Sequence, residues 1–188
     1  MTDHPLHQAT VSSAAITPLQ RLTRFAQDMG MLTDRPVIAK RILVELCDAT
    51  TCRQGALYLL DREHDQYDCV MTVGLQNTTA LVPSFAPAHI LVQSLAREYH
   101  ILSVAEVADI PPIKPELADA LRAAHSSLAV ALLNKGRLIA FALFGLPSNR
   151  PLDHADGRDL LTALAQSGAN ALDSISRAAC PTRARSRR

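Results

Sequence analysis

The stretch that decides the fold is "RLIAFALFGLPSNRPLDHADGRDLL", from Arg137 to Leu161. It begins with an unbroken apolar run, Leu138–Phe144, passes through a cluster of Gly, Pro and Asn residues, and ends in the start of a helix. A strand with one solvent-exposed face alternates apolar and polar residues. Because this run does not alternate, we expect a strand that is covered on both faces.

Hairpins place this strand in an antiparallel sheet. A second apolar run, Leu128–Leu133, is joined to it by the tight turn "NKG", in which Gly can adopt a positive φ. Two further strand-like segments, Gly55–Asp61 and Tyr67–Gly74, flank the polar link "REHDQ". A shorter strand is expected at His100–Val104. We therefore predict a central antiparallel sheet of five to six strands.

Long amphipathic helices are predicted near both ends of the chain. Thr17 is a typical N-cap, Pro18 suits the first helical position and Gln20 completes a capping box. A second helix begins after Asp34, and the last begins after Asp153, each with the aspartate as cap. The buried stripe of the first helix is predicted to be Leu19, Leu22, Phe25, Ala26 and Met29, with Gly30 as its stop.

The middle of the chain, residues 75–124, is irregular and rich in proline. Short helices are expected there at Pro87–Glu98 and Pro115–Ala124. Since the central strands need cover on both faces, we predict an α/β (α+β) fold with the long N- and C-terminal helices on one face. The irregular segments form a roof over the other face, and such a roof leaves a pocket beneath it.

Composition favours one domain without nucleic-acid or membrane partners. The chain has 188 residues, a net charge of +1 and few aromatic residues. Its apolar runs are far shorter than the ~20 residues of a spanning helix, and the N-terminus lacks a secretory signal. We expect a cytoplasmic protein with reduced thiols. Residues 1–16 are predicted to be a flexible lead-in, 17–177 the domain, and 178–188 a flexible basic tail.

The order of elements and the stretch "SSLAVALLNKGRLIAFALFGLPSNRPLDHADGRDLLTALAQSGANAL" resemble the C-terminal half of a GAF domain. That family shows a strand ending in an apolar or Pro-Leu step (here Ala131-Leu132), a basic-Gly turn, a second strand, an acidic turn and a Leu/Ala-rich helix. The resemblance implies a regulatory or sensory module of cytoplasmic signalling. Such modules bind a small molecule, or dimerise through their flanking helices without a ligand.

The resemblance names no cofactor for this chain. Cyclic-nucleotide-binding members continue the "NK" pair with Phe-Asp-Glu, which is missing here, and bilin-binding members carry a roof cysteine, whereas none lies between Gly74 and Ser127. Free methionine sulfoxide reductases use cysteines around the pocket, but this chain offers no such pair in the roof. The "DHAD" motif is explained by helix capping rather than a metal. We therefore expect no catalytic or metal-binding residues.

Pocket-lining candidates follow from strand alternation and from the histidines near the roof. They are Tyr58, Cys69, Met71, His89, His100, His125 and Phe141. Tyr58 leads, because a buried phenol needs a hydrogen-bond partner that a ligand can supply. The alternatives are that a strand residue faces the long helices, and that a histidine is an exposed polar residue at an element end. A histidine in the pocket would suit haem iron or an anionic ligand.

Three functions are consistent with the sequence. In the first, a sensory module binds an unknown small molecule or a partner protein and transmits the signal through its terminal helices, which also form a homodimer. It either acts in trans on a signalling protein or is part of a longer protein. In the second, the domain is a ligand-free dimerisation scaffold, because small residues on the last helix permit close approach. The third, a methionine sulfoxide reductase-like enzyme, needs a low-pKa thiolate beside a resolving thiol.

Overall fold

The computed structural model describes residues 17–75, 84–98, 100–104, 115–145 and 155–178. Its helices are α1 (Pro18–Met31), α2 (Arg35–Thr50), α3 (Ile90–Arg97), α5 (Pro115–Ala123) and α6 (Ala155–Ala178). Its strands are β1 (Gln54–Asp61), β2 (Gln66–Val73), β3 (Ser84–Phe85), β4 (Ile101–Ser103), β5 (Leu128–Asn134) and β6 (Arg137–Gly145). The predicted cap at Asp153 and the predicted flexible segment 1–16 lie outside the described residues, as does the tail after Ala178.

All strand pairs are antiparallel, in the order β3-β2-β1-β6-β5-β4, which confirms the predicted fold class. The apolar run of the opening stretch is β6, between β1 and β5. Every residue from Leu138 to Phe144 is buried, because Ala142 and Phe144 face α2 and α6 whereas Phe141 and Leu143 face the opposite layer. We call these two sides of the sheet the helix face and the roof face.

The β5–β6 turn explains how two strands with long buried stretches become neighbours. Its two central residues, Lys135 and Gly136, both have positive φ, at 51° and 74°. Turns with positive φ at both central positions match the twist of the strands that they connect. The predicted hairpin is therefore present, and Lys135 adopts the left-handed backbone together with the glycine.

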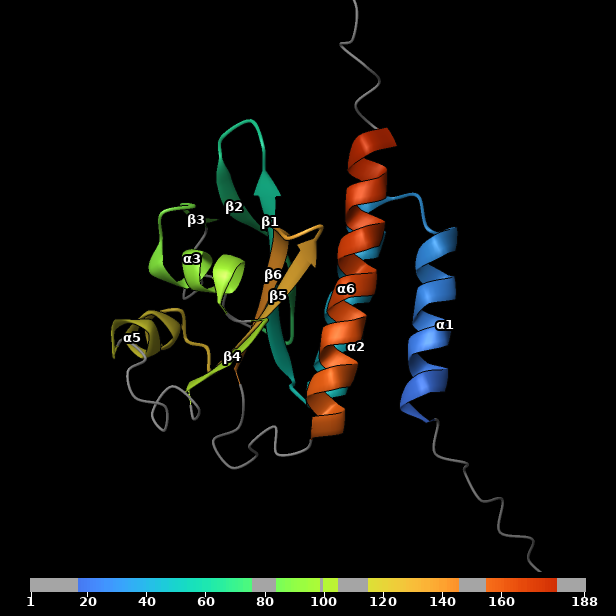
Figure 1. Ribbon diagram of the computed structural model, residues 1–188, viewed down its shortest axis with the longest axis horizontal. Helices are drawn as coiled ribbons and strands as arrows, with labels where there is room; N and C mark the ends of the chain where they lie inside the picture. The colour runs from blue at the N-terminus through green and yellow to red at the C-terminus, as the bar shows by residue number, and fades with distance from the viewer. Residues whose placement is uncertain (1–16, 76–83, 99, 105–114, 146–154, 179–188) are drawn as a thin grey trace, which may run out of the picture.

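The helix face is covered by α2 and α6, and α1 packs outside α6 (Figure 1). A Cβ added to Gly168 of α6 would lie 2.9 Å from two side-chain carbons of Ile42 in α2, so these helices approach closely. Buried Glu45 forms ion pairs with Arg21 of α1 and with Arg41 at 3.0 Å. The three helices thus form one body against the sheet.

The predicted capping box of α1 is present, but its predicted buried stripe is partly wrong. Phe25 and Met29 are buried and Leu22 is half-buried, whereas Leu19 is 73% exposed and Ala26 is exposed. An outermost helix contacts its neighbours only along a narrow stripe, which three residues at helical spacing fill.

The roof face is covered by α3 and α5, on the far side of the sheet from the long helices (Figure 1). Helix α3 begins at Ile90, later than predicted, because His89 acts as its N-cap. The two-residue strand β3, which the sequence did not predict, pairs with β2 at Tyr67 and Asp68. The roof therefore contributes both helices and an edge strand.

Candidate functional site

Aromatic rings fill the middle of the roof face. Tyr58 and Phe141 are cross-strand partners whose rings stack at 4.9 Å with planes 8° apart. Phe85 of the roof meets both rings edge-on, at 4.9 and 5.4 Å. The Tyr67 hydroxyl donates a hydrogen bond to the Leu138 carbonyl at 3.0 Å. Two of the predicted pocket residues, Tyr58 and Phe141, thus lie together under the roof, packed against protein atoms.

The Tyr58 phenol has a partner within the chain. Tyr58 and Cys69 are paired across β1 and β2, and a hydrogen bond joins their side chains. Burial, followed by the nearby Cys69, raises the pKa of Tyr58. Burial also raises the pKa of Cys69, which the Tyr58 hydrogen bond lowers only in part. Both groups are neutral at physiological pH, and the buried phenol does not depend on a ligand for its hydrogen bond.

Met71 was expected beside Cys69, and that expectation is wrong. Leu57 pairs with Met71 and Tyr58 with Cys69, so Val70 is an extra residue that interrupts the β1–β2 register. Such a bulge reverses the alternation that follows it. Cys69 faces the roof, whereas Met71 packs with the helix-face core. Alternation alone cannot reveal an inserted residue.

The three predicted histidines lie at element ends. His89 is half-buried, and its Nδ1 accepts a hydrogen bond from the Leu91 amide at 3.3 Å. Its ring stands edge-on to Phe85 at 5.0 Å, and burial lowers its pKa. His100 and His125 are exposed, before β4 and after α5. Only His89 therefore joins the aromatic cluster that contains Tyr58.

The remaining described cysteines belong to the helix face. Cys47 and Cys52 are buried at the C-terminal end of α2, where the Cys52 amide donates to the Cys47 carbonyl at 2.9 Å. Burial, with a smaller contribution from Cys52, raises the pKa of Cys47 to about 12. Burial also raises the pKa of Cys52. Thiols of this kind are poor nucleophiles. Cys180 lies outside the described residues.

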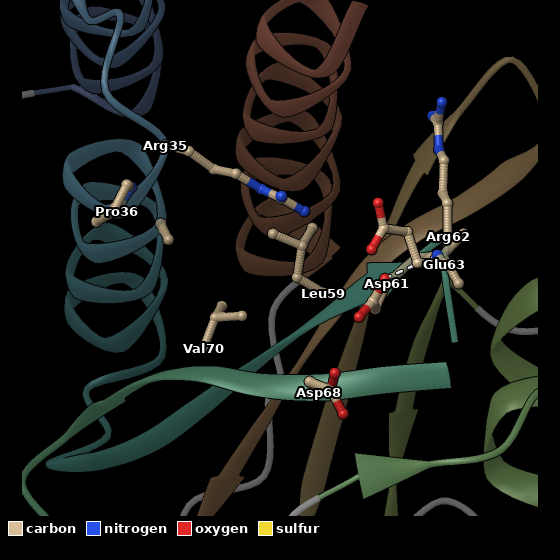
Figure 2. A pocket seen from close by; sticks show the side chains of 10 residues that line it. Arg35, Pro36, Leu59, Asp61, Arg62, Glu63, Asp68 and Val70 are labelled. Atoms are coloured by element: carbon tan, nitrogen blue, oxygen red, sulfur yellow. Dashed lines mark hydrogen bonds between the residues drawn. The ribbon is translucent and has the colours of Figure 1, made fainter. Parts of the chain in front are cut away.

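A cleft that the sequence analysis missed lies on the helix face, between the start of α2 and the β1–β2 hairpin (Figure 2). We call it the hairpin cleft. Its volume is about 490 Å³. It is lined by Arg35, Pro36, Ala39, Leu59, Leu60, Asp61, Arg62, Glu63, Asp68 and Val70. The sequence offered one signal for this cleft. Asp68 is a carboxylate within a predicted strand, between Tyr67 and Cys69.

A second feature, which we call the Asp173 junction, connects both hairpins to α6. The Asp173 carboxylate is only 7% exposed. It accepts hydrogen bonds from Arg62, beside the β1–β2 turn, at 3.3 Å and from Asn134, at the β5–β6 turn, at 2.9 Å. It also pairs with Arg177 one turn along α6. One carboxylate therefore holds two hairpins that are distant in sequence.

Two negative findings bound the chemistry of the described residues. Among them, no group of three or more His, Cys, Asp or Glu side chains is arranged to hold a metal ion. None of the described helices is long and apolar enough to cross a bilayer. Neither the aromatic cluster nor the hairpin cleft is thus marked as a metal site.

Comparison with known structures supports the fold. A GAF domain of a phosphoenolpyruvate-protein phosphotransferase from Coxiella burnetii has a TM-score of 0.63 at 20% identity, covering 89% of this chain and 99% of that one. A phycoerythrobilin-bound GAF domain of a cyanobacterial phytochrome has a TM-score of 0.62 at 13% identity, covering 87% and 98%. A free methionine-R-sulfoxide reductase from Neisseria meningitidis, in complex with its substrate, has a TM-score of 0.59 at 18% identity, covering 94% and 99%.

The comparison with curated proteins finds no match. The GAF domain family model matches residues 34–172, from the cap of α2 into α6. That span contains the whole sheet, all of α2 and most of α6, the two helices that pack directly on its helix face. The chain therefore belongs to the GAF domain family.

Proposed function

We propose that this chain is a regulatory GAF module that receives a small-molecule or partner signal and passes it on through its terminal helices. The observation that carries the proposal is the Asp173 junction, because it couples the tips of both hairpins to α6. The GAF domains with similar structures, one from a phosphoenolpyruvate-protein phosphotransferase and one bound to phycoerythrobilin in a phytochrome, support a sensory role.

The junction suggests how a signal reaches α6. A buried carboxylate that loses one of its donors is costly, so a shift of either hairpin favours a matching shift of α6. Helix α1 packs against α6 and follows it. A small displacement of the sheet edge is thereby converted into a movement of two helices, which is a common route for switching between two packed states.

A homodimer through the terminal helices is part of the proposal. Leu19 and Met31, near opposite ends of α1, are 73% and 84% exposed, which leaves apolar area for a second copy. The resulting dimer would act in trans on a cytoplasmic signalling protein. The alternative, a ligand-free dimerisation scaffold, uses the same helices. The aromatic packing of the roof face favours that alternative, because it leaves Tyr58 satisfied without a ligand.

A reductase-like enzyme is disfavoured by the state of the three thiols that the structure describes. The Neisseria meningitidis relative is an enzyme of this fold, so the idea has a structural precedent. Thiol chemistry needs an accessible thiolate. The pKa values of Cys47, Cys52 and Cys69 are all raised by burial, which opposes thiolate formation. We therefore propose a non-enzymatic role.

A ligand screen combined with hydrogen exchange tests the regulatory role. The full chain is screened by thermal shift against nucleotides, keto acids, amino acids and haem, where a ligand at a hundredfold excess over Kd stabilises by about 2.7 kcal/mol. Any hit is expected to change amide exchange in α6, and Asp173→Asn is expected to abolish that change. Asp119→Asn, which removes an exposed carboxylate on α5, is the matched control.

One outcome would end the regulatory proposal, and a second would end the part of it that rests on Asp173. No response across the panel, together with a dimer whose size is unaffected by any compound, would leave the scaffold role. A ligand response that reaches α6 equally in Asp173→Asn would instead remove the junction as its route.

A further inference from the structure

We propose that the hairpin cleft is a binding site for a small zwitterion with an apolar body, carrying a carboxylate at one end and an ammonium group at the other. The molecules of this class are ω-amino acids and very short peptides. The cleft lies on the helix face, on the opposite side of the sheet from the aromatic cluster around Tyr58. The inference therefore stands whether or not the roof face binds a ligand.

The cleft is apolar where a ligand body would lie. Pro36 and Ala39 of α2 form one wall, with Leu59 of β1 and Val70 of β2 opposite. Val70 is the bulged residue, and its side chain is 43% exposed in a strand that otherwise packs against the core. Bulges often re-aim a side chain at a functional site. A volume of about 490 Å³ falls within the range of small-molecule pockets.

Arg35 stands on the wall opposite three carboxylates, and the one other cation among the lining residues, Arg62, is paired with Asp173 of α6. Figure 2 shows the Arg35 side chain extending from the first turn of α2 toward the hairpin, where the carboxylates of Asp61, Glu63 and Asp68 lie. Within the described part of the chain, the side chains of Arg35 and Glu63 form no hydrogen bond or ion pair. Asp68 accepts a single bond, from Gln66 at 2.9 Å. The remaining carboxylate, Asp61, is engaged by His64 at 2.6 Å.

These charges select the ligand class. A carboxylate can receive two parallel hydrogen bonds from the Arg35 guanidinium. An ammonium group at the other end can donate to Glu63 and Asp68, which have acceptor positions to spare. A ligand with only an anion would face three carboxylates, and one with only a cation would face Arg35. Only a molecule with both ends satisfies both walls.

Occupancy of the cleft also bears on α6, a consequence that rests on the proposed function. Arg62 lines the cleft and bonds Asp173 of α6. A ligand that draws the hairpin toward α2 would strain the hydrogen bond between Arg62 and Asp173. Its effect would pass to α6 through that bond. The binding measurement below does not depend on this coupling, so the failure of one is distinguishable from the failure of the other.

The test is calorimetry on the full chain with the ω-amino derivatives of butanoate, hexanoate and octanoate. At least one is expected to bind, with a dependence on chain length, and hexanoate and hexylamine are expected to bind about tenfold more weakly or worse. Arg35→Gln and Glu63→Gln are each expected to weaken binding about tenfold. Val70→Asp should abolish binding of the apolar body. Arg97→Gln, at an exposed position on α3, is the control and should bind normally.

Circular dichroism of each variant checks that the fold is retained, which the exposure of Arg35, Glu63 and Val70 favours. The proposal is overturned if none of the three amino acids binds at ~10 mM, a level at which even weak sites fill. Equal binding of hexanoate and its amino derivative, or unchanged affinity in folded Arg35→Gln and Glu63→Gln, would overturn it as well.

Discussion

The two faces of the sheet are packed by different kinds of side chain. The roof face is packed by rings, with Tyr58, Phe85 and Phe141 in mutual contact. The helix face is packed mainly by aliphatic side chains from α2 and α6, and its only ring from β6 is Phe144. Ring contacts have preferred geometries, whereas aliphatic cores tolerate substitutions that keep the total volume comparatively well. The roof face should therefore tolerate changes of shape less well than the helix face.

The largest expected effect compares Phe141 with Phe144, both fully buried in β6. Phe141→Ala and Phe144→Ala should each cost about 3–5 kcal/mol in the free energy of unfolding. Substitution by Leu separates the two faces. Phe141→Leu loses its contacts with Tyr58, Tyr67 and Phe85, each worth about 0.5–1.5 kcal/mol beyond area. Urea unfolding measures both, and equal costs for the two Leu variants would contradict the difference between the faces.

The next effect concerns the close approach of α2 and α6 on the helix face. Gly168→Ala places a methyl 2.9 Å from Ile42, and overpacking of this kind costs about 1–3 kcal/mol, more than the gain in helix propensity. Gly157, near the start of α6, has no atoms near its added Cβ. Gly157→Ala should be neutral or stabilising by up to about 1 kcal/mol. Thermal unfolding of the two variants checks this. Stabilisation by both substitutions would show that the Ile42 side chain can move aside at little cost.

A smaller effect tests the hydrogen bond between Tyr58 and Cys69. Tyr58→Phe should cost about 1 kcal/mol, because one buried hydrogen bond is lost while the ring stacking is kept. Since this bond lowers the pKa of Cys69, the substitution should raise that pKa further. Alkylation of Cys69 by iodoacetamide, followed against pH by mass spectrometry, should then shift to more alkaline pH. An unchanged profile would mean that the phenol does not donate to the thiol.

The smallest effect lies at the β1–β2 turn, outside both faces. The Asp61 side-chain hydrogen bond raises the pKa of His64, and the same bond lowers the pKa of Asp61. A raised His pKa adds stability at low pH that is lost as pH rises through the folded value. A lowered Asp pKa adds stability at higher pH that is lost as pH falls through the folded value. The pair should therefore contribute mainly between these two transitions.

Nuclear magnetic resonance titration of His64 measures this contribution directly. In the wild-type chain its midpoint should lie above the ordinary value, and Asp61→Asn should return it toward that value. If the His64 midpoint does not respond to the substitution, His64 and Asp61 do not form the proposed pair.

Local sequence patterns predicted most of the fold. The β6 run, the Lys135-Gly136 turn and the capping box at Thr17 are each determined by a few adjacent residues. In the box, the Thr17 hydroxyl accepts from the Gln20 amide at 3.3 Å and the Gln20 side chain accepts from the Thr17 amide at 3.0 Å. Alternation also predicts that Tyr58, Cys69 and Phe141 share one face of the sheet. It does not say which of the two faces that is.

The missed features depend on contacts between distant parts of the chain. Asp173 meets Arg62 across 111 positions and Asn134 across 39, so no window of sequence contains the junction. The hairpin cleft requires the first turn of α2 to lie beside the β1–β2 hairpin, which the tertiary packing decides. Met71 was misplaced because the register of β2 against β1, rather than its composition, contains the extra residue.

That extra residue sets the two halves of β2 in independent alternation. Removing Val70 alone would leave Cys69 opposite Tyr58 and Met71 opposite Leu57, now as consecutive residues, so every side chain of the strand would keep its present side of the sheet. When this strand is aligned without a gap to a relative lacking the insertion, matched letters beyond Cys69 would point to opposite sides of the protein.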